Sequence, residues 1–274
     1  MLNLIKMDIH RLFHTKSFKV AIIFSAILPF VGIAVVSGLL LIFQEMMKSP
    51  ENAQALAAFP LFGWLTNGVT LPEIVLTGFN VLSLIVSTVL TAIFINSEQE
   101  TGYIKNIAGQ LSNRGTMIVS KICTIAVINL VIFAIYTGIS SLACMLFLQF
   151  VLKSGSLTPL LTTLAVKFLL YMAIDAIILF ICTLTKSKAL SVAIGVIFGI
   201  GISGFSYSIL GNILNLVFKT TNINLSFFTP DGMNSILAIN SEADIIIKAI
   251  IVAVIYIAGF MIASSIVIKK RDVR

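Results

Sequence analysis

The chain has 274 residues, of which 58% are hydrophobic and only 11% are charged, and it carries a net charge of +7 with a mean hydropathy of +1.09. A soluble domain of this length needs far more polar surface, so the composition excludes that class and predicts an all-α integral membrane protein. The positive charges are scattered over short segments, which favours a role in membrane orientation over nucleic-acid binding.

Residues 1–18 predict an interfacial segment, with an amphipathic helix over residues 1–16 lying on the inner membrane surface. The apolar positions at helical spacing are Leu2, Ile5, Ile9, Leu12 and Phe13, and the polar residues opposite them are Asn3, Lys6, His10 and His14. The two histidines lack an HExxH arrangement and a third ligand nearby, so they do not predict a metal site. The segment is too charged, and the next apolar run too long, for a cleaved signal peptide.

Six apolar runs reach the roughly 20 residues that a helix needs to cross about 30 Å of hydrocarbon. They cover residues 19–43, 74–96, 117–150, 160–185, 189–210 and 247–268. Three cysteines fall inside these runs, at positions 123, 144 and 182, and we interpret them as packing residues rather than disulfides. The sequence therefore predicts one six-helix transmembrane domain over residues 1–274. Residues 44–73 and 211–246 form outer segments, the second with short helices or a re-entrant piece.

The distribution of Lys and Arg predicts the orientation of the spans. If the N-terminus is cytoplasmic, the inner segments hold 13 of the 18 basic residues. These are Lys6, Arg11, Lys16, Lys19, Lys105, Arg114, Lys121, Lys186, Lys188, Lys269, Lys270, Arg271 and Arg274. An even number of spans then leaves both termini in the cytoplasm.

Polar side chains inside the spans have two interpretations. In the second run, Asn80, Ser83, Ser87 and Thr91 recur every three or four residues and share one helical face. This face either bonds neighbouring helices together or lines one wall of a polar translocation path. Asp175 in the fourth run is a functional candidate, because a charge at membrane depth is expensive. Protonation or a hydrogen bond from Tyr171 makes it structural instead.

Small residues in the fifth run favour a close helix–helix contact. Gly195 and Gly199 form a GxxxG pattern, and Gly204 follows it. Such a face lets two backbones approach closely, and the partner helix belongs either to this chain or to a second copy.

The loop over residues 97–115 has the features of a short cytoplasmic helix. Ser97 and Glu100 form an S-x-x-E capping box that predicts a helix starting just past residue 96. An apolar stripe follows, made of Ile104, Ile107, Ala108 and Leu111. This pattern suits docking into a groove of another protein, and the alternative is a helix that lies on the lipid surface.

The whole arrangement resembles the permease subunit of type-2 ABC exporters, a group that includes bacteriocin, lantibiotic and toxic-peptide transporters. The resemblance rests on the interfacial N-terminal segment, the six spans, and a second span that runs into "SEQETGYIKNIAGQLSNRGTMIVSK". The residues that carry the motif are Glu98, Glu100, Gly102, Lys105, Asn106, Ser112, Arg114 and Lys121.

The resemblance implies a non-enzymatic subunit whose N-terminal segment is an elbow helix and whose 97–115 loop is a coupling helix. In that family the loop contacts a separate ATPase, here through Glu98, Glu100, Gly102, Ile104, Lys105, Ile107 and Leu111. Two ATP-binding subunits hold ATP and Mg²⁺, and a second permease chain, identical or related, completes the transporter. This chain itself has no GxxxxGK[ST], HExxH, GxSxG or CxxC motif and predicts no cofactor of its own.

The expected cargo is amphipathic or hydrophobic, with exported peptides such as bacteriocins or cytolytic toxins ahead of drugs, lipids or sodium. The expected location is a bacterial plasma membrane. Two alternatives stay open. One is a stand-alone channel or ion-coupled transporter with Asp175 as its coupling site, and the other is a membrane-embedded enzyme.

Overall fold

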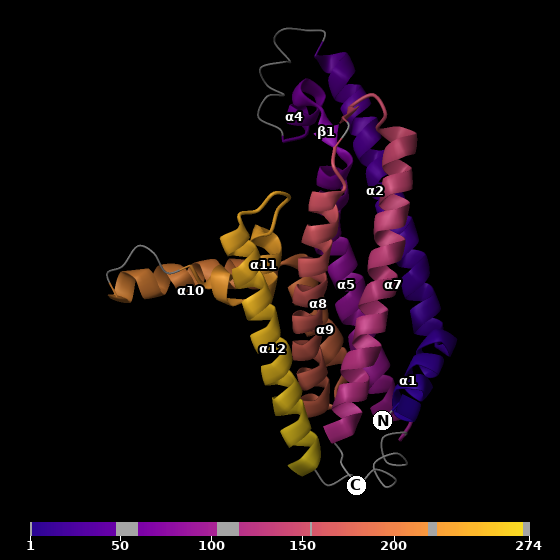
Figure 1. Cartoon of the computed structure of the whole chain (residues 1–274), viewed down its shortest axis with the longest axis vertical. Helices are drawn as coiled ribbons and strands as arrows, with labels where there is room; N and C mark the ends of the chain where they lie inside the picture. Colours follow the sequence, from indigo (N-terminus) through magenta and orange to yellow (C-terminus); the bar gives the residue numbers. More distant parts are fainter. Residues whose placement is uncertain (1, 48–59, 103–114, 154, 219–223, 271–274) are drawn as a thin grey trace.

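A computed structural model describes residues 2–47, 60–102, 115–153, 155–218 and 224–270, and nearly all of this part of the chain is helical (Figure 1). The elements before the first long break are α1 (Leu2–His14) and α2 (Lys16–Met46). The next are α4 (Pro60–Asn67), β1 (Val69–Thr70), α5 (Leu71–Glu100), α7 (Gly115–Phe147) and β2 (Leu152–Lys153). The last are α8 (Thr158–Thr185), α9 (Lys188–Ile200), α10 (Ile202–Phe218), η1 (Leu225–Phe228), α11 (Pro230–Ile236) and α12 (Ala243–Lys270).

Among the described residues, five helices are long and apolar enough to cross a membrane: α2, the Val81–Glu100 part of α5, α7, α8 and α12. The pair α9 and α10 passes the same test when its two parts are taken together. The chain is therefore an all-α, multi-pass membrane protein with five such helices, or six if this pair is one span.

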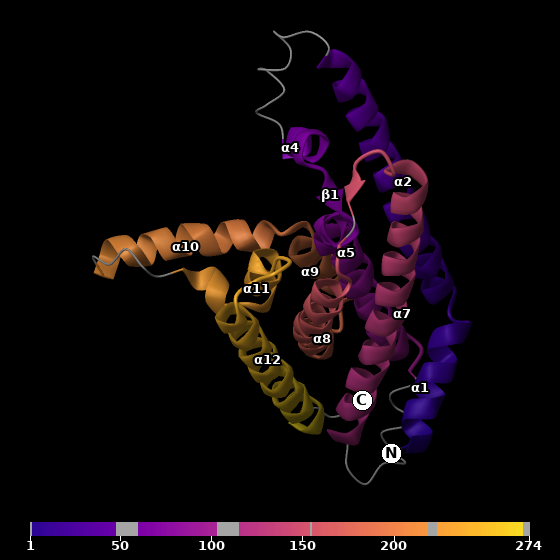
Figure 2. The same cartoon turned by 45° about the horizontal axis from the view of Figure 1, so that its top comes forward.

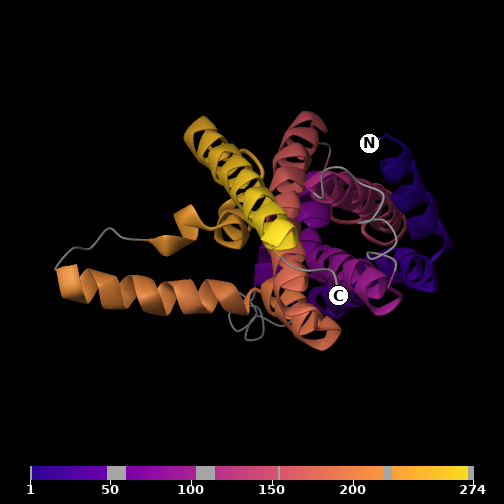
Figure 3. The ribbon, with the colours of Figure 1, turned by 90° about the horizontal axis from the view of Figure 1, so that it is seen from below.

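The run predicted as a span over residues 189–210 is divided by a bend. Helix α9 ends at Ile200, and α10 leaves it at an angle of 73°. Gly201 between them has a φ of +80°, a left-handed conformation that ends helices and that glycine adopts without a steric penalty. Figures 1 and 3 show α10 extending sideways from the bundle.

The bundle is built around α8, which packs against α12, α5 and α7 and is the most buried of the spanning helices. Helices α2 and α12 are the least buried, and their outward side chains are large and apolar. They include Ile23, Phe24, Ile27 and Val31 on α2, and Ile251, Val254, Ile255 and Ile262 on α12. Such faces suit contact with lipid, which offers no hydrogen-bond partner.

The two ends of the bundle differ in composition and structure. Helix α1, the end of α5, the start of α7 and the end of α12 meet at one end, whereas α4, β1 and β2 lie at the other (Figures 1 and 2). Strands β1 and β2 pair in parallel, with Val69 opposite Leu152, and so join the chain before α5 to the chain after α7. The candidate functional site lies at the α1 end.

Candidate functional site

Helix α1 is held against the bundle by one buried face. Leu4, Asp8 and Leu12 are buried at a spacing of four residues, and the helix packs against α7 and α2. Of the predicted apolar stripe, Leu12 is buried against the bundle, whereas Leu2 is 74% exposed and Phe13 is 44% exposed. Thr15 then starts α2, since its hydroxyl oxygen accepts a hydrogen bond from Phe18 N–H at 3.4 Å, as N-cap residues do.

Four charged side chains meet where α1, α5 and α7 converge. Lys121 Nζ lies 2.9 Å from Asp8 Oδ2 and 2.5 Å from Glu98 Oε1. Arg11 donates to the same Glu98 oxygen, and Ser120 Oγ donates to Asp8 Oδ2 at 2.6 Å. We call Asp8, Arg11, Glu98 and Lys121 the ionic cluster. Its two carboxylates and two cations balance, which is the condition under which buried charges persist.

The aromatic ring of Phe94 packs against the two cations of the ionic cluster. The Arg11 guanidinium carbon lies 4.8 Å from the centre of the Phe94 ring, and Lys121 Nζ lies 5.7 Å from it, so both cations face the ring. Leu12, Ile95 and Ile118 are buried in the same core cluster. The ionic cluster is therefore a packed junction of three helices.

The predicted helix start at Ser97 is wrong. Ser97, Glu98 and Glu100 form the last turn of α5, and Ser97 Oγ donates back to Phe94 O at 2.7 Å instead of capping a new helix. Helix α5 thus extends past the predicted end of the apolar run at residue 96, and Glu98 in this last turn is paired within the chain. Gly102 follows with a φ of +70°. The remaining predicted loop residues, Ile104, Lys105, Ile107 and Leu111, lie outside the described part of the chain.

The two predicted coupling carboxylates have different surroundings. Only 1% of the Glu98 side chain is exposed, whereas 56% of the Glu100 side chain is exposed, with its carboxylate 3.8 Å from Lys188 Nζ at the start of α9. Glu98 therefore holds helices together inside this chain, and Glu100 is accessible from outside.

The polar face of α5 points into the bundle. Ser83 Oγ shares a hydrogen bond of 2.9 Å with the Tyr171 hydroxyl of α8. Ser87 Oγ lies 2.5 Å from Asn129 Oδ1 of α7 and 2.7 Å from Asp175 Oδ2 of α8. Asn129 Nδ2 donates to that same carboxyl oxygen at 2.8 Å. Of the two interpretations of this face, the described contacts match the bonding of neighbouring helices, because they form a network that joins three helices of one chain. The role of this face as one wall of a path stays a prediction.

Two further residues predicted for the translocation path are also buried within the bundle. Thr91 and Asp175 are completely buried, as are Ser83 and Ser87. The Asn80 side chain lies outside the described part of the chain. Tyr171, which the sequence suggested as a partner for Asp175, bonds to Ser83 instead.

Two of the three predicted packing glycines lie against α5. A Cβ added to Gly199 lies 2.3 Å from Ile85 Cγ1 and 2.8 Å from Ile85 Cα, and one added to Gly195 lies 3.2 Å from Thr88 Cβ. Thr88 Oγ1 also donates to Gly195 O at 2.9 Å. A Cβ on Gly204, on α10, meets nothing within 4 Å among the described residues.

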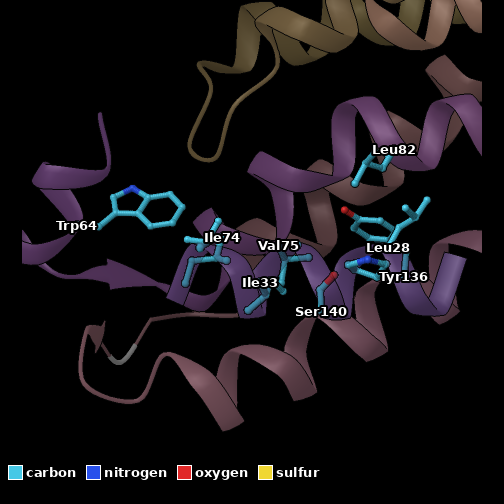
Figure 4. Close-up of a pocket in the computed structure, with 11 residues that line it drawn as sticks. Leu28, Ile33, Trp64, Ile74, Val75, Leu82, Tyr136 and Ser140 are labelled. Carbon is cyan, nitrogen blue, oxygen red and sulfur yellow. The ribbon is translucent and has the colours of Figure 1, made fainter. Parts of the chain in front are cut away.

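The described residues line at least two apolar hollows along α2. The larger, an open groove of about 530 Å³ between α2 and α5, is lined by Ser17, Val20, Ala21, Phe24, Leu28, Ile85, Val86, Val89, Leu90 and Ile93. The smaller, of about 170 Å³, has Trp64 at one end and Tyr136 and Ser140 on α7 (Figure 4). Its volume is below that of usual ligand pockets, so the groove is the better binding surface.

Sequence reasoning missed Asp8 and Asn129. Asp8 stands four residues from both Leu4 and Leu12, so its position on the buried face was a readable signal. Asn129 is a single amide within an apolar stretch of α7, and the sequence does not show which helix it faces. A further missed contact joins Lys167 Nζ of α8 to Asn234 of α11, at 2.9 Å from the backbone oxygen and 3.2 Å from Oδ1.

The described residues contain no group of three or more His, Cys, Asp or Glu side chains that could hold a metal ion. His10 and His14 stack on each other, and His14 Nδ1 lies 2.7 Å from the His10 carbonyl oxygen. No protein-family model and no curated protein sequence matches the chain. Any function must therefore be argued from the residues and their geometry.

Proposed function

We propose that this chain is the membrane-spanning subunit of an ATP-driven exporter of the type-2 ABC class. Two permease chains, identical or related, pair with two separate ATP-binding subunits that hold ATP and Mg²⁺. The complex lies in a bacterial plasma membrane, with the α1 end and both termini in the cytoplasm. Closure of the ATPases switches the cavity between the permeases from inner to outer access.

The ionic cluster is the observation that carries this proposal. Residues 103–114 connect the end of α5, whose last turn holds Glu98, to the start of α7, whose second turn holds Lys121, and these two side chains are bonded to each other and to α1. A force applied to the loop therefore acts on three helices through one junction. This is the mechanical arrangement that a subunit driven from its cytoplasmic end requires.

Glu100 and the apolar loop residues form the proposed contact with the ATPase. Glu100 is exposed beside the loop and is available for a charged partner. Ile104, Ile107 and Leu111 supply apolar contact area, while Glu100 and Lys105 set the alignment through charge. Glu98 acts indirectly, by holding α1 against the helix ends.

The groove between α2 and α5 is the proposed wall of the cargo route. Ile85, Val89 and Ile93 recur every four residues along α5 and face the groove, and α2 adds Val20, Phe24 and Leu28. An apolar wall of this length suits amphipathic peptides better than ions or sugars. The polar face of α5 lies inside the chain and takes no part in this route.

The test is coexpression of the chain with the ATPase subunit from a neighbouring gene, followed by co-purification and measurement of ATP hydrolysis. We expect the ATPase to bind the wild-type chain and to be lost from the Ile107→Asp variant, because an acidic side chain opposes burial in an apolar groove. Leu157→Asp is the matched control, since Leu157 is 58% exposed just before α8, away from the loop.

Two results contradict the proposal. Retention of the ATPase and of export by Ile107→Asp would make the loop a surface connection. Transport that follows an ion gradient with no ATPase bound would support the stand-alone transporter instead.

A further inference from the structure

The side chains of Ser87, Asn129 and Asp175 form a closed ring deep inside the bundle. The three contacts measure 2.5 Å between Ser87 Oγ and Asn129 Oδ1, 2.7 Å between Ser87 Oγ and Asp175 Oδ2, and 2.8 Å between Asn129 Nδ2 and Asp175 Oδ2. Each is a full hydrogen-bond distance. Each therefore needs one hydrogen between its two heavy atoms, because lone pairs that face each other at this separation repel.

An ionised Asp175 leaves the ring one hydrogen short. The Ser87 hydroxyl has one hydrogen, and the Asn129 amide directs one N–H to the carboxyl oxygen. A carboxylate adds none, so two hydrogens must serve three contacts. The single hydroxyl hydrogen of Ser87 points along one line only, so one of the two contacts of Ser87 Oγ is left with lone pairs that face each other.

Reversing the Asn129 amide does not change this count. In that orientation Nδ2 donates to Ser87 Oγ, and Ser87 donates to Asp175 Oδ2. The amide oxygen of Asn129 then faces Asp175 Oδ2 with no hydrogen between them. In either orientation, only the carboxyl group of Asp175 can supply the third hydrogen.

No opposite charge stabilises an ionised Asp175. In the described chain no Lys, Arg or His makes a salt bridge to it. The nearest cation on its own helix, Lys167, donates to Asn234 on α11. Glu98 of α5 and Lys121 of α7 are paired in the ionic cluster.

Other titratable groups stand on α8 and on the helices that surround it. Tyr171 and Cys182 lie on α8 itself, and the Tyr171 hydroxyl bonds to Ser83. Helix α9 carries Lys188 at its first residue, α7 carries Tyr136, and α11 carries Asp231. Helix α12 has Tyr256 within it and Asp244, Lys248, Lys269 and Lys270 near its ends. None of them makes an ion pair with the Asp175 carboxyl group.

We propose that Asp175 is a buried proton site, in which the carboxyl group stays protonated and donates to Ser87 Oγ. Ser87 then donates to Asn129, and Asn129 donates to Asp175. Each group gives one hydrogen and accepts one, so the ring is complete and neutral, and its three bonds reinforce one another. The ring fastens α5, α7 and α8 together. This inference does not rest on the proposed function, because it concerns one chain only.

Infrared spectroscopy of the full chain in lipid bilayers tests the charge state directly. A protonated carboxyl group gives a carbonyl stretching band apart from that of a carboxylate, and labelling aspartate with ¹³C at the side-chain carboxyl moves the aspartate bands alone. The chain has five Asp residues, at positions 8, 175, 231, 244 and 272. We expect a label-sensitive band of a protonated acid at neutral pH that is lost in Asp175→Asn and kept in Asp231→Asn.

A wild-type spectrum without a label-sensitive protonated band overturns the proposal, even if no variant can be purified. A band that survives in Asp175→Asn also overturns it.

Thermal unfolding of the Asp175 variants gives a second test of the neutral ring. Asp175→Asn should unfold close to the wild-type temperature, because a neutral amide supplies the missing hydrogen once the Asn129 amide reverses. Asp175→Leu should unfold at a clearly lower temperature, and equal losses in the two variants contradict the neutral ring.

Discussion

Two carboxylates in the last turn of α5 lie in different environments and have different proposed roles. Glu98 holds helices of this chain together, and Glu100 is the proposed contact with a partner. Glu98 is 1% exposed between two cations, and Glu100 is 56% exposed with one cation 3.8 Å away. Removing one partner from a buried pair leaves an uncompensated charge, whereas an exposed pair is screened by water. The sequence motif contains both residues and cannot distinguish these environments, because it says nothing about the neighbours of each carboxylate.

We predict that Glu98→Gln destabilises the chain by about 3 kcal/mol or more, since Asp8 is then the one carboxylate left in the ionic cluster beside two cations. Glu100→Gln should cost about 1 kcal/mol or less. Thermal unfolding in detergent measures both. The double variant Glu98→Gln/Lys121→Met restores the charge balance and should lose less than the sum of its single variants. Equal effects of the two glutamine variants would show that Glu98 is not held in a buried cluster.

At the scale of elements, the contact between α5 and α9 depends on the absence of a side chain at one position. A Cβ at Gly199 would lie 2.8 Å from the backbone Cα of Ile85, so a whole helix must move to admit it. We predict that Gly199→Ala destabilises the chain by about 1–3 kcal/mol, the usual cost of overpacking. Gly204→Ala is the control and should be tolerated, because its Cβ meets nothing within 4 Å. Equal stability of the two variants by thermal unfolding would contradict this contact.

Hydropathy predicts which segments are spanning helices but not how they are arranged. The runs at 19–43, 117–150, 160–185 and 247–268 correspond to α2, α7, α8 and α12, because helix length and apolarity are local properties. The bend at Gly201 lies within a continuous apolar run, so hydropathy has no signal for it. The same limit applies to the polar face of α5. Its spacing predicts a shared face, but only the fold shows that Asn129 and Asp175 are opposite it.

At the scale of the whole molecule, the two ends of the bundle carry different charges. The α1 end has the ionic cluster together with Lys16, Lys19, Lys186, Lys188, Lys269 and Lys270. Away from that end, Glu73 and Lys153 lie at or beside β1 and β2, and Glu242, Asp244 and Lys248 lie at the start of α12. Basic residues are retained on the cytoplasmic side of a membrane. This charge difference supports the proposal that the α1 end is cytoplasmic, which the proposed contact with an ATPase requires.

We predict that a cysteine at Lys188 reacts with a membrane-impermeant thiol reagent only after the cells are permeabilised, and that one at Ser156 reacts in intact cells. Both positions lie at or beside helix ends, and Lys188 is the first residue of α9 while Ser156 precedes α8. The three native cysteines are replaced by alanine beforehand, because Cys123 is only partly buried and Cys144 and Cys182 are free thiols as well. Labelling at Lys188 in intact cells, with none at Ser156, would reverse the orientation. The ionic cluster would then lie outside the cell, where no ATP is available, and the proposed coupling role would be wrong.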